Sequence, residues 1–156
     1  MIAFSLSRLE KENIRLEGTE PPEFILLAES DSFTVSSVVS YALDISKVSG
    51  GALVSGEVWT DISGECGRCL APVSRKITTE KFQFFVETPS GVEVCDISEE
   101  VRTEITLALP MNLLCREDCR GLCPECGADL NVGKCSCKPK SPRGSGVWDA
   151  LDDLKL

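Results

Sequence analysis

The sequence contains no histidine, one tyrosine and only 6% aromatic residues, yet nine of its 156 residues are cysteines. The absence of histidine counts against a catalytic zinc site, in which histidine commonly stands beside an open coordination position. The odd number of cysteines counts against a framework made of disulfides alone. Because disulfides are rare in a reducing cytoplasm, the cysteines are better explained as metal ligands.

Long apolar runs are also missing. The longest uncharged stretch, residues 32–43, is too short and too rich in serine to span a membrane. The N-terminus reaches a charged residue, Arg8, without the apolar core and cleavage site of a signal peptide. We therefore expect a cytoplasmic protein with no membrane segment.

Basic residues are scarce. Sixteen Lys and Arg face 25 Asp and Glu, which gives a net charge of -9 and a pI near 4.6. A protein that binds nucleic acid over a wide area normally shows a basic face, so a wide footprint is excluded. Only the cysteine-rich segment, residues 115–143, has more basic than acidic side chains. Contact with RNA must be local to this segment, or must run through a basic protein partner.

Residues 33–87 have the pattern of β-strands. They are dense in β-branched residues, and along residues 52–63 Val54, Val58 and Ile62 fall on one strand face while Glu57 and Asp61 fall on the other. Residues 82–86 repeat the alternation. We predict an α+β fold with an antiparallel, barrel-like β-sheet, one main helix and a C-terminal cysteine-rich zinc module.

The spacing of the apolar residues changes from that of a strand to that of a helix near residue 97. Asp96 and Glu99 have the spacing of a capping box, and Pro110 ends the helix predicted near residues 97–109. The apolar side chains that share one face of this helix are Ile97, Val101, Ile105 and Ala108. An RNA-processing enzyme would need acidic side chains that converge in a pocket. Glu99, Glu100 and Glu104 are better explained as a solvated helix face, so we expect the protein to have no catalytic activity.

Three regions follow from these patterns. Residues 1–112 form a β-rich acidic domain, residues 113–138 a zinc-binding module, and residues 139–156 a linker with a short amphipathic tail. Trp148, Leu151 and Leu154 have helical spacing in that tail.

The segment Cys123-Pro124-Glu125-Cys126-Gly127 has the form of a zinc knuckle, in which glycine can adopt the left-handed conformation after the second cysteine. Cys135 and Cys137 complete an all-cysteine set of four. This set predicts one zinc site.

Cys115 and Cys119 then offer only two sulfurs for a second ion. Cys66 and Cys69 supply the missing pair if the tip of the hairpin between two predicted strands lies beside the end of the helix. Eight cysteines thus close two structural zinc sites, and Cys95 is left as a small packed thiol.

Spacing alone leaves other partitions open, such as one in which Cys119 joins the knuckle with Cys137. Cys66-Gly67-Arg68-Cys69 also has the spacing of a dithiol redox motif. Such motifs begin a helix, whereas the flanking residues here are predicted strands, which disfavours redox catalysis.

Basic side chains around the cysteines have two explanations. They could compensate the formal charge of about -2 on each four-thiolate zinc site, or they could contact RNA phosphates or a partner. Stacking aromatic residues are absent from residues 115–143, which removes one usual support for binding single-stranded RNA. The candidate contact residues are Arg116, Arg120, Lys134, Lys138, Lys140 and Arg143.

The run CREDCRGLCPECGADLNVGKCSC, together with the upstream CGRCL, the helix ending in ITLALP and the terminal WDALDDL, resembles the YceD family, named for large ribosomal RNA subunit accumulation. The resemblance spans roughly Gly56 to the C-terminus. It implies a bacterial or plastid-type factor, cytoplasmic or stromal, that is required for normal accumulation of 23S rRNA. It also implies a link to large-subunit assembly and no established catalytic activity. The family ending reads more often DPR, where this chain has Ser141-Pro142-Arg143.

These observations predict a non-enzymatic ribosome-biogenesis factor that supports 23S rRNA synthesis, processing or stability. Its partner would be large-subunit rRNA or a basic ribosomal or assembly protein. The alternative is a protein-protein adaptor with structural zinc and no direct RNA contact.

Overall fold

The computed structural model describes residues 1–27, 32–79, 81–88 and 91–137. The chain divides into two units, Met1–Cys119 and Arg120–Leu156, and the helices and strands of the described residues lie in the first. In chain order these are β1 (Ala3–Ser5), α1 (Leu6–Leu9), β2 (Ile14–Glu20), the 3-10 helix η1 (Pro22–Phe24), β3 (Phe33–Val35), β4 (Val39–Val48), β5 (Gly51–Glu65), β6 (Pro72–Thr78), β7 (Phe82–Glu87), β8 (Val94–Asp96) and α2 (Ser98–Ala108).

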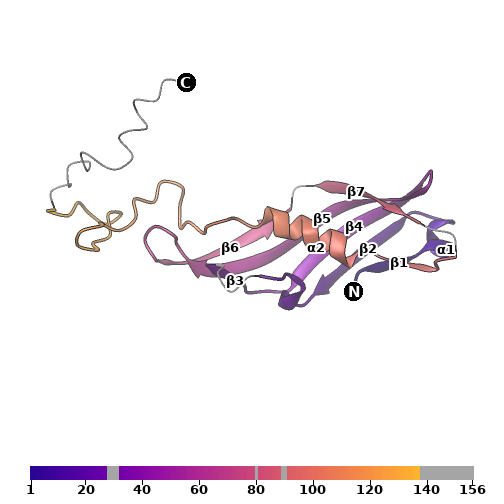
Figure 1. Ribbon diagram of the computed structural model, residues 1–156, viewed down its shortest axis with the longest axis horizontal. Helices are drawn as coiled ribbons and strands as arrows, with labels where there is room; N and C mark the ends of the chain where they lie inside the picture. Colours follow the sequence, from indigo (N-terminus) through magenta and orange to yellow (C-terminus); the bar gives the residue numbers. More distant parts are fainter. Residues whose placement is uncertain (28–31, 80, 89–90, 138–156) are drawn as a thin grey trace, which may run out of the picture. The chain divides into compact units, whose positions relative to one another are not determined.

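The long strand β5 is the centre of an antiparallel sheet (Figure 1). Along one of its edges β5 pairs with β4 and then with β3, and along the other with β7 and then with β6. β2 extends the sheet beyond β4. β3 and β4 are therefore two parts of one interrupted line, as are β6 and β7.

Both interruptions are stabilised by side-chain hydroxyls. The hydroxyl of Ser37 accepts the N–H of Asp61 at 2.9 Å, and the Thr60 hydroxyl donates to the Ser37 carbonyl at 3.3 Å. On the other edge, the Thr79 hydroxyl accepts the N–H of Val58 at 2.8 Å. The hydroxyls replace missing ladder bonds, so the buried polar groups stay paired. Residues that interrupt a strand, as Ser37 and Thr79 do here, bend it locally in the manner of a β-bulge.

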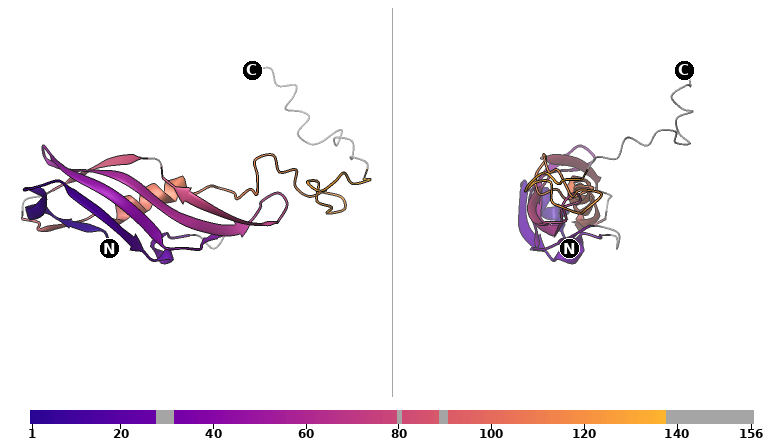
Figure 2. Two further views of the ribbon diagram at one scale, coloured as in Figure 1. Left: turned by 180° about the vertical axis from the view of Figure 1, so that it is seen from behind. Right: turned by 90° about the vertical axis from the view of Figure 1, so that its left-hand side faces the viewer.

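The predicted alternation in β5 and the predicted helix are confirmed. Val54, Val58 and Ile62 are fully buried on one face of the sheet, and they share a core with the buried side chains of α2. The buried side chains of α2 are Val101 and Ile105, and Ile97 at the N-cap position is buried beside them. Two views show the strands curving around α2 (Figure 2).

The antiparallel sheet is confirmed, but the closed barrel is not shown. Among the described residues, β2 pairs only with β4, and β6 and β7 pair only with β5, so the sheet has two open edges. The small β1–β8 ribbon is a separate sheet. Because α2 fills the inner face of the main sheet, the core is covered without closure.

The predicted capping box is wrong. Ile97 occupies the cap position, and the Asp96 carboxylate accepts both the N–H and the hydroxyl of Ser98, at 2.9 and 2.6 Å. These bonds lower the pKa of Asp96. Glu99 does not reach back toward the cap, because its carboxylate pairs with Arg102 one turn later.

The first unit ends at Cys119, so residues 113–119 belong with the sheet although the sequence grouped them with the C-terminal module. Leu113 explains this placement, since its side chain is fully buried in the core of the first unit. The predicted linker and tail, residues 139–156, lie outside the described residues. Among the helices that the structure describes, we find none with the length and apolar character needed to cross a membrane.

Candidate metal centres

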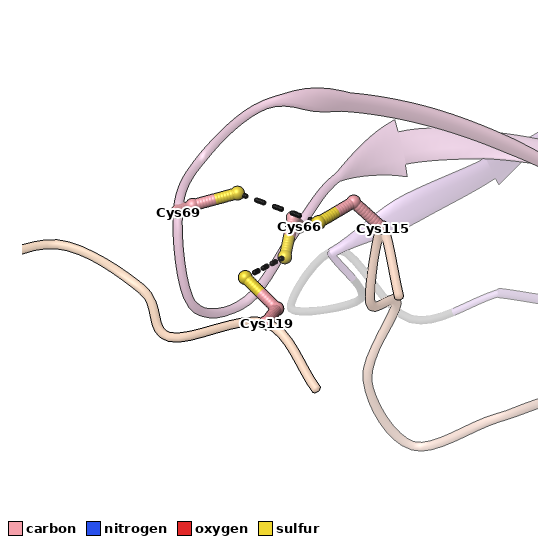
Figure 3. A group of neighbouring side chains, drawn as sticks. All are labelled: Cys66, Cys69, Cys115 and Cys119. Carbon is pink, nitrogen blue, oxygen red and sulfur yellow. Dashed lines mark hydrogen bonds between the residues drawn. The ribbon is translucent and has the colours of Figure 1, made fainter. Parts of the chain in front are cut away.

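Four cysteine sulfurs converge at the tip of the β5–β6 hairpin (Figure 3). Cys66 and Cys69 come from the hairpin, and Cys115 and Cys119 from the segment that follows α2. The Sγ atoms of Cys66 and Cys119 lie 3.8 Å apart, those of Cys69 and Cys115 lie 3.6 Å apart, and all four are within 4.8 Å of one another. Four sulfurs held tetrahedrally at about 2.3 Å from zinc lie about 3.8 Å apart. The arrangement therefore fits a zinc ion.

The segment that carries Cys115 and Cys119 is attached to the hairpin by backbone contacts. The N–H of Gly67 donates to the carbonyl of Leu113 at 2.8 Å. The guanidinium of Arg68 donates to the carbonyls of Glu117 and Cys119, at 3.0 and 2.9 Å. Arg68 thus positions the second pair of sulfurs as well as bringing positive charge to the cluster.

A tight turn shapes the hairpin tip. The N–H of Leu70 donates to the carbonyl of Cys66 at 2.9 Å, and the N–H of Cys66 donates to the carbonyl of Ala71 at 2.8 Å. Leu70 has a φ of 60°, and no other non-glycine among the described residues has a positive φ. This left-handed conformation turns the chain so that two sulfurs face one point.

The second cluster lies in the second unit and repeats this turn. Gly127, with a φ of 71°, donates its N–H to the carbonyl of Cys123 at 2.8 Å, and Cys123 donates to the carbonyl of Ala128 at 2.8 Å. Residues 66–71 and 123–128 are therefore the same knuckle, with leucine at one left-handed position and glycine at the other. The sulfurs within 4.8 Å of one another here are those of Cys123, Cys126, Cys135 and Cys137.

Backbone amides favour the ionised form of one thiol in the first cluster. Hydrogen bonds from the backbone of Cys115, and then of Arg68 and Cys69, lower the pKa of Cys66 to about 6 although burial opposes the shift. The pKa of Cys115 is raised to about 12, first by its hydrogen bond with the Cys119 thiol and then by burial. Four thiolates cannot gather this closely without a cation, and a bound metal ion supplies one.

The second cluster has the same division. Hydrogen bonds from the backbone of Cys126 and Glu125 lower the pKa of Cys123 to about 7. The pKa of Cys137 is raised to about 12, first by its hydrogen bond with the Cys126 thiol. Each cluster thus has one thiol ready to ionise and another that ionises only when a metal replaces its proton.

The structure brings the eight predicted ligands together in the two groups of four that were predicted for two zinc ions. Cys119 lies with Cys66, and Cys137 lies with Cys123, so the partition that joined Cys119 to Cys137 is not the one formed. Cys95 lies on β8 opposite Phe4, outside both groups, and burial raises its pKa.

Three of the predicted contact residues are described, and each is exposed. Arg116 forms an ion pair with Asp118 at 3.4 Å in the first unit, whereas Arg120 and Lys134 belong to the second. The structure gives no position for the remaining candidates, Lys138, Lys140 and Arg143.

Two contributors to the first cluster were missed by sequence reasoning. Leu113 fell within the bounds of the predicted zinc module, and Leu70 was given no role. Aligning CGRCLA with CPECGA would have placed Leu70 opposite the knuckle glycine. Nothing in the sequence marks the burial of Leu113, which depends on where the helix ends.

Comparison with known proteins places this arrangement in a family. Residues 86–155 match the family described as "Large ribosomal RNA subunit accumulation protein YceD", and this range holds six of the eight clustered cysteines. A Zea mays protein named "Large ribosomal RNA subunit accumulation protein YCED homolog 1, chloroplastic" is 39% identical over 57 residues, which are 36% of this chain and 20% of the maize protein. The chain belongs to the YceD family.

Similarity to mycobacterial proteins extends further along the chain. An uncharacterized protein of Mycobacterium tuberculosis is 33% identical over 102 residues, 56% of this chain and 49% of the relative. One from Mycobacterium leprae is 30% identical over 132 residues, 74% of this chain and 58% of the relative. The chain spans about half the length of the mycobacterial relatives it matches. No solved structure matches it.

The YceD match begins after Cys66 and Cys69. The family match therefore does not cover these two residues, half of the first cluster, and their assignment rests on the sulfur count and on geometry. Their sulfurs lie 3.8 and 3.6 Å from the sulfurs of Cys119 and Cys115, which are within the matched range.

Proposed function

We propose that this YceD-family protein is a non-enzymatic factor that supports the accumulation of 23S rRNA and assembly of the large ribosomal subunit in the cytoplasm. The observation that carries the proposal is the family match over residues 86–155, with relatives named for this role. Support of rRNA synthesis, of its processing or of its stability would each increase the amount of 23S rRNA.

Two structural zinc ions belong to this proposal. Each four-cysteine cluster supplies four sulfurs at a separation that suits tetrahedral coordination. When bound, zinc would cross-link the segments that carry the sulfurs. Four thiolates fill the coordination sphere and leave no position for a substrate or an activated water, which supports a structural role.

The partner follows from the charge distribution. With a net charge of -9, the protein favours a basic ribosomal or assembly protein over a wide contact with RNA. Direct contact with rRNA would be limited to the basic side chains near the clusters, such as Arg116, Arg120 and Lys134. An adaptor that reaches the ribosome through protein alone is the second candidate, and the same acidic charge favours it.

Removing the gene from its host and measuring the ratio of 23S to 16S rRNA tests the function. We expect the ratio to fall, and to be restored by the wild-type protein and by Cys95→Ser, whose sulfur lies outside both clusters. A protein carrying Cys66→Ser and Cys123→Ser should fail to restore it at equal abundance. An unchanged ratio in the deletion strain would refute the proposed function.

Affinity purification with and without RNase separates the two modes of action. If the protein contacts rRNA directly, purified 23S rRNA freed of protein should bind to it. If the protein is an adaptor, the association should be lost when ribosomal proteins are removed and should survive RNase.

A further inference from the structure

The strand β7 is an edge of the main sheet, and its sequence, FQFFVE, is mostly apolar. Among the described residues β7 pairs only with β5, and Figure 1 and Figure 2 both show it at the rim of the sheet. The side chains of Phe82, Phe84 and Val86 pack against the core but remain partly exposed. On the opposite face, the side chain of Phe85 is 50% exposed. An apolar edge of this kind can pair with a strand of another chain.

The other edge strands have features that discourage such pairing. β2 exposes the charged side chains of Arg15 and Glu17. β6 exposes those of Arg75 and Lys76, and β3 has only three residues. Charged side chains and a short length are usual protections of an edge strand. β7 has six residues, and the last is its first charged one, so its edge lacks both protections.

The direction of one carbonyl shows which backbone groups of β7 face its free edge, the side turned away from β5. The carbonyl oxygen of Val86 points toward β5, since a Cβ at Gly51 would lie 2.2 Å from it. Backbone groups point alternately to the two sides along an antiparallel strand. The N–H and C=O groups of Gln83 and Phe85 therefore point to the free edge, where a further strand could accept and donate hydrogen bonds.

The sequence of β7 is complementary to itself. A two-fold axis at Phe84 would place each Gln83 opposite Phe85 of a second copy, so that the two residues could exchange backbone hydrogen bonds. The same axis would place Lys81 opposite Glu87 of the second copy, once on each side. Both charged side chains are exposed, and the ion pairs formed within the described part of the chain include neither.

We propose that two copies of this chain associate through their β7 strands and form one continuous antiparallel sheet across a two-fold axis. On the inner face, Phe82 lies opposite Val86 of the second copy and Phe84 lies at the axis, so the partly exposed apolar side chains cover one another. The lysine and glutamate at the ends of β7 set the register. This inference does not depend on the proposed function.

Sedimentation velocity of the full, zinc-loaded chain at increasing concentration measures the association. Six paired residues in each chain make a small interface, so we expect a dimer with a dissociation constant on the order of 10 μM. Lys81→Glu gives two like-charge pairs in the dimer, and Glu87→Lys does so with the opposite sign. Each variant should weaken association about tenfold. Glu17→Lys, which reverses an exposed charge on the opposite edge strand, should leave it unchanged.

Mixing the two weakened variants tests the register. In a heterodimer of Lys81→Glu with Glu87→Lys both pairs join unlike charges, so the mixture should recover the association of the wild type. Effects within one chain cannot produce this recovery. An example of such an effect is an altered attraction between Lys81 and Glu57, which line the same surface hollow.

Gln83→Pro tests strand pairing itself. Proline removes an N–H that faces the free edge, a position at which edge strands tolerate it. The variant should remain monomeric and keep the circular dichroism spectrum of the wild type. A wild type that is monomeric up to about 1 mM would overturn the proposal. A mixture that does not recover association, or a Gln83→Pro protein that dimerises like the wild type, would do the same. None of these measurements involves rRNA, so their failure leaves the proposed function standing.

Discussion

Replacing Cys66 by serine tests the first metal centre most directly. The Cys69 and Cys115 sulfurs, which the same ion would join, are 46 residues apart in sequence and 3.6 Å apart in space. A cross-link that closes a loop of this length removes chain entropy from the unfolded state, and the loop-length relation gives about 4 kcal/mol at 25 °C. We therefore expect Cys66→Ser to lower the free energy of unfolding of the first unit by about 4 kcal/mol when zinc is present.

Two measurements check this value. Elemental analysis should find about two zinc ions per wild-type chain and about one in Cys66→Ser, since four thiolates bind each ion. Urea denaturation followed by circular dichroism gives the difference in stability. Cys95→Ser should retain both ions, and Cys126→Ser should lose one without changing the denaturation of the sheet.

The chelated wild-type protein serves as the control. After chelation the wild type has lost the same cross-link, so its stability should fall to that of the chelated Cys66→Ser protein. A difference that persists at full chelation would mean that Cys66 stabilises the fold by packing and not through a metal. One zinc ion per wild-type chain would equally refute the two-centre assignment.

Three further predictions concern the core, the knuckle and the dependence on pH. Leu113→Ala empties a fully buried position and should lower the free energy of unfolding by about 2–5 kcal/mol in urea titrations, whereas Leu107→Ala, at a position that is 76% exposed, should stay within about 0.5 kcal/mol. Leu70→Gly should raise stability by up to about 1 kcal/mol, because glycine adopts the φ of 60° without strain; a loss of that size would contradict the assigned conformation. Zinc affinity should fall as the pH is lowered through the pKa values of Cys66 and Cys123, about 6 and about 7, because protons compete for the thiolates; competition with a chromophoric chelator would measure it, and a flat profile would exclude thiolate ligands.

Much of the partition of the cysteines could be predicted, because part of it depends on local signals. The spacing of Cys123 and Cys126 identifies a knuckle on its own, and the strand patterns before Cys66 and after Cys69 place these residues at a hairpin tip. The sum of eight sulfurs for two tetrahedral ions then assigns Cys115. The first site still depended on one long-range contact, between the hairpin tip and the end of the helix, which the structure supplies.

The parts that could not be predicted depend on tertiary packing. The breaks in the strands beside β5 arise where hydroxyls such as that of Thr79 replace ladder bonds, and serine and threonine are common enough that no pattern marks these positions. Sheet closure depends on what covers the inner face, which alternation within a strand does not reveal. Leu70 has a left-handed backbone conformation, for which glycine is the usual residue, so the residue itself gave no sign of this turn.

The two clusters also differ in when they can be completed during synthesis of the chain. The sulfurs of the second cluster lie between Cys123 and Cys137, so a nascent chain can capture its ion soon after that short stretch emerges. The first cluster cannot be completed until Cys119 has been synthesised. By then the β5–β6 hairpin has already been translated, and its two thiols lack their partner ligands. For that interval Cys66 and Cys69 are a free dithiol. With zinc as the proposed ion, the supply of zinc and reductant to the nascent chain would set how much of the protein reaches its cross-linked form.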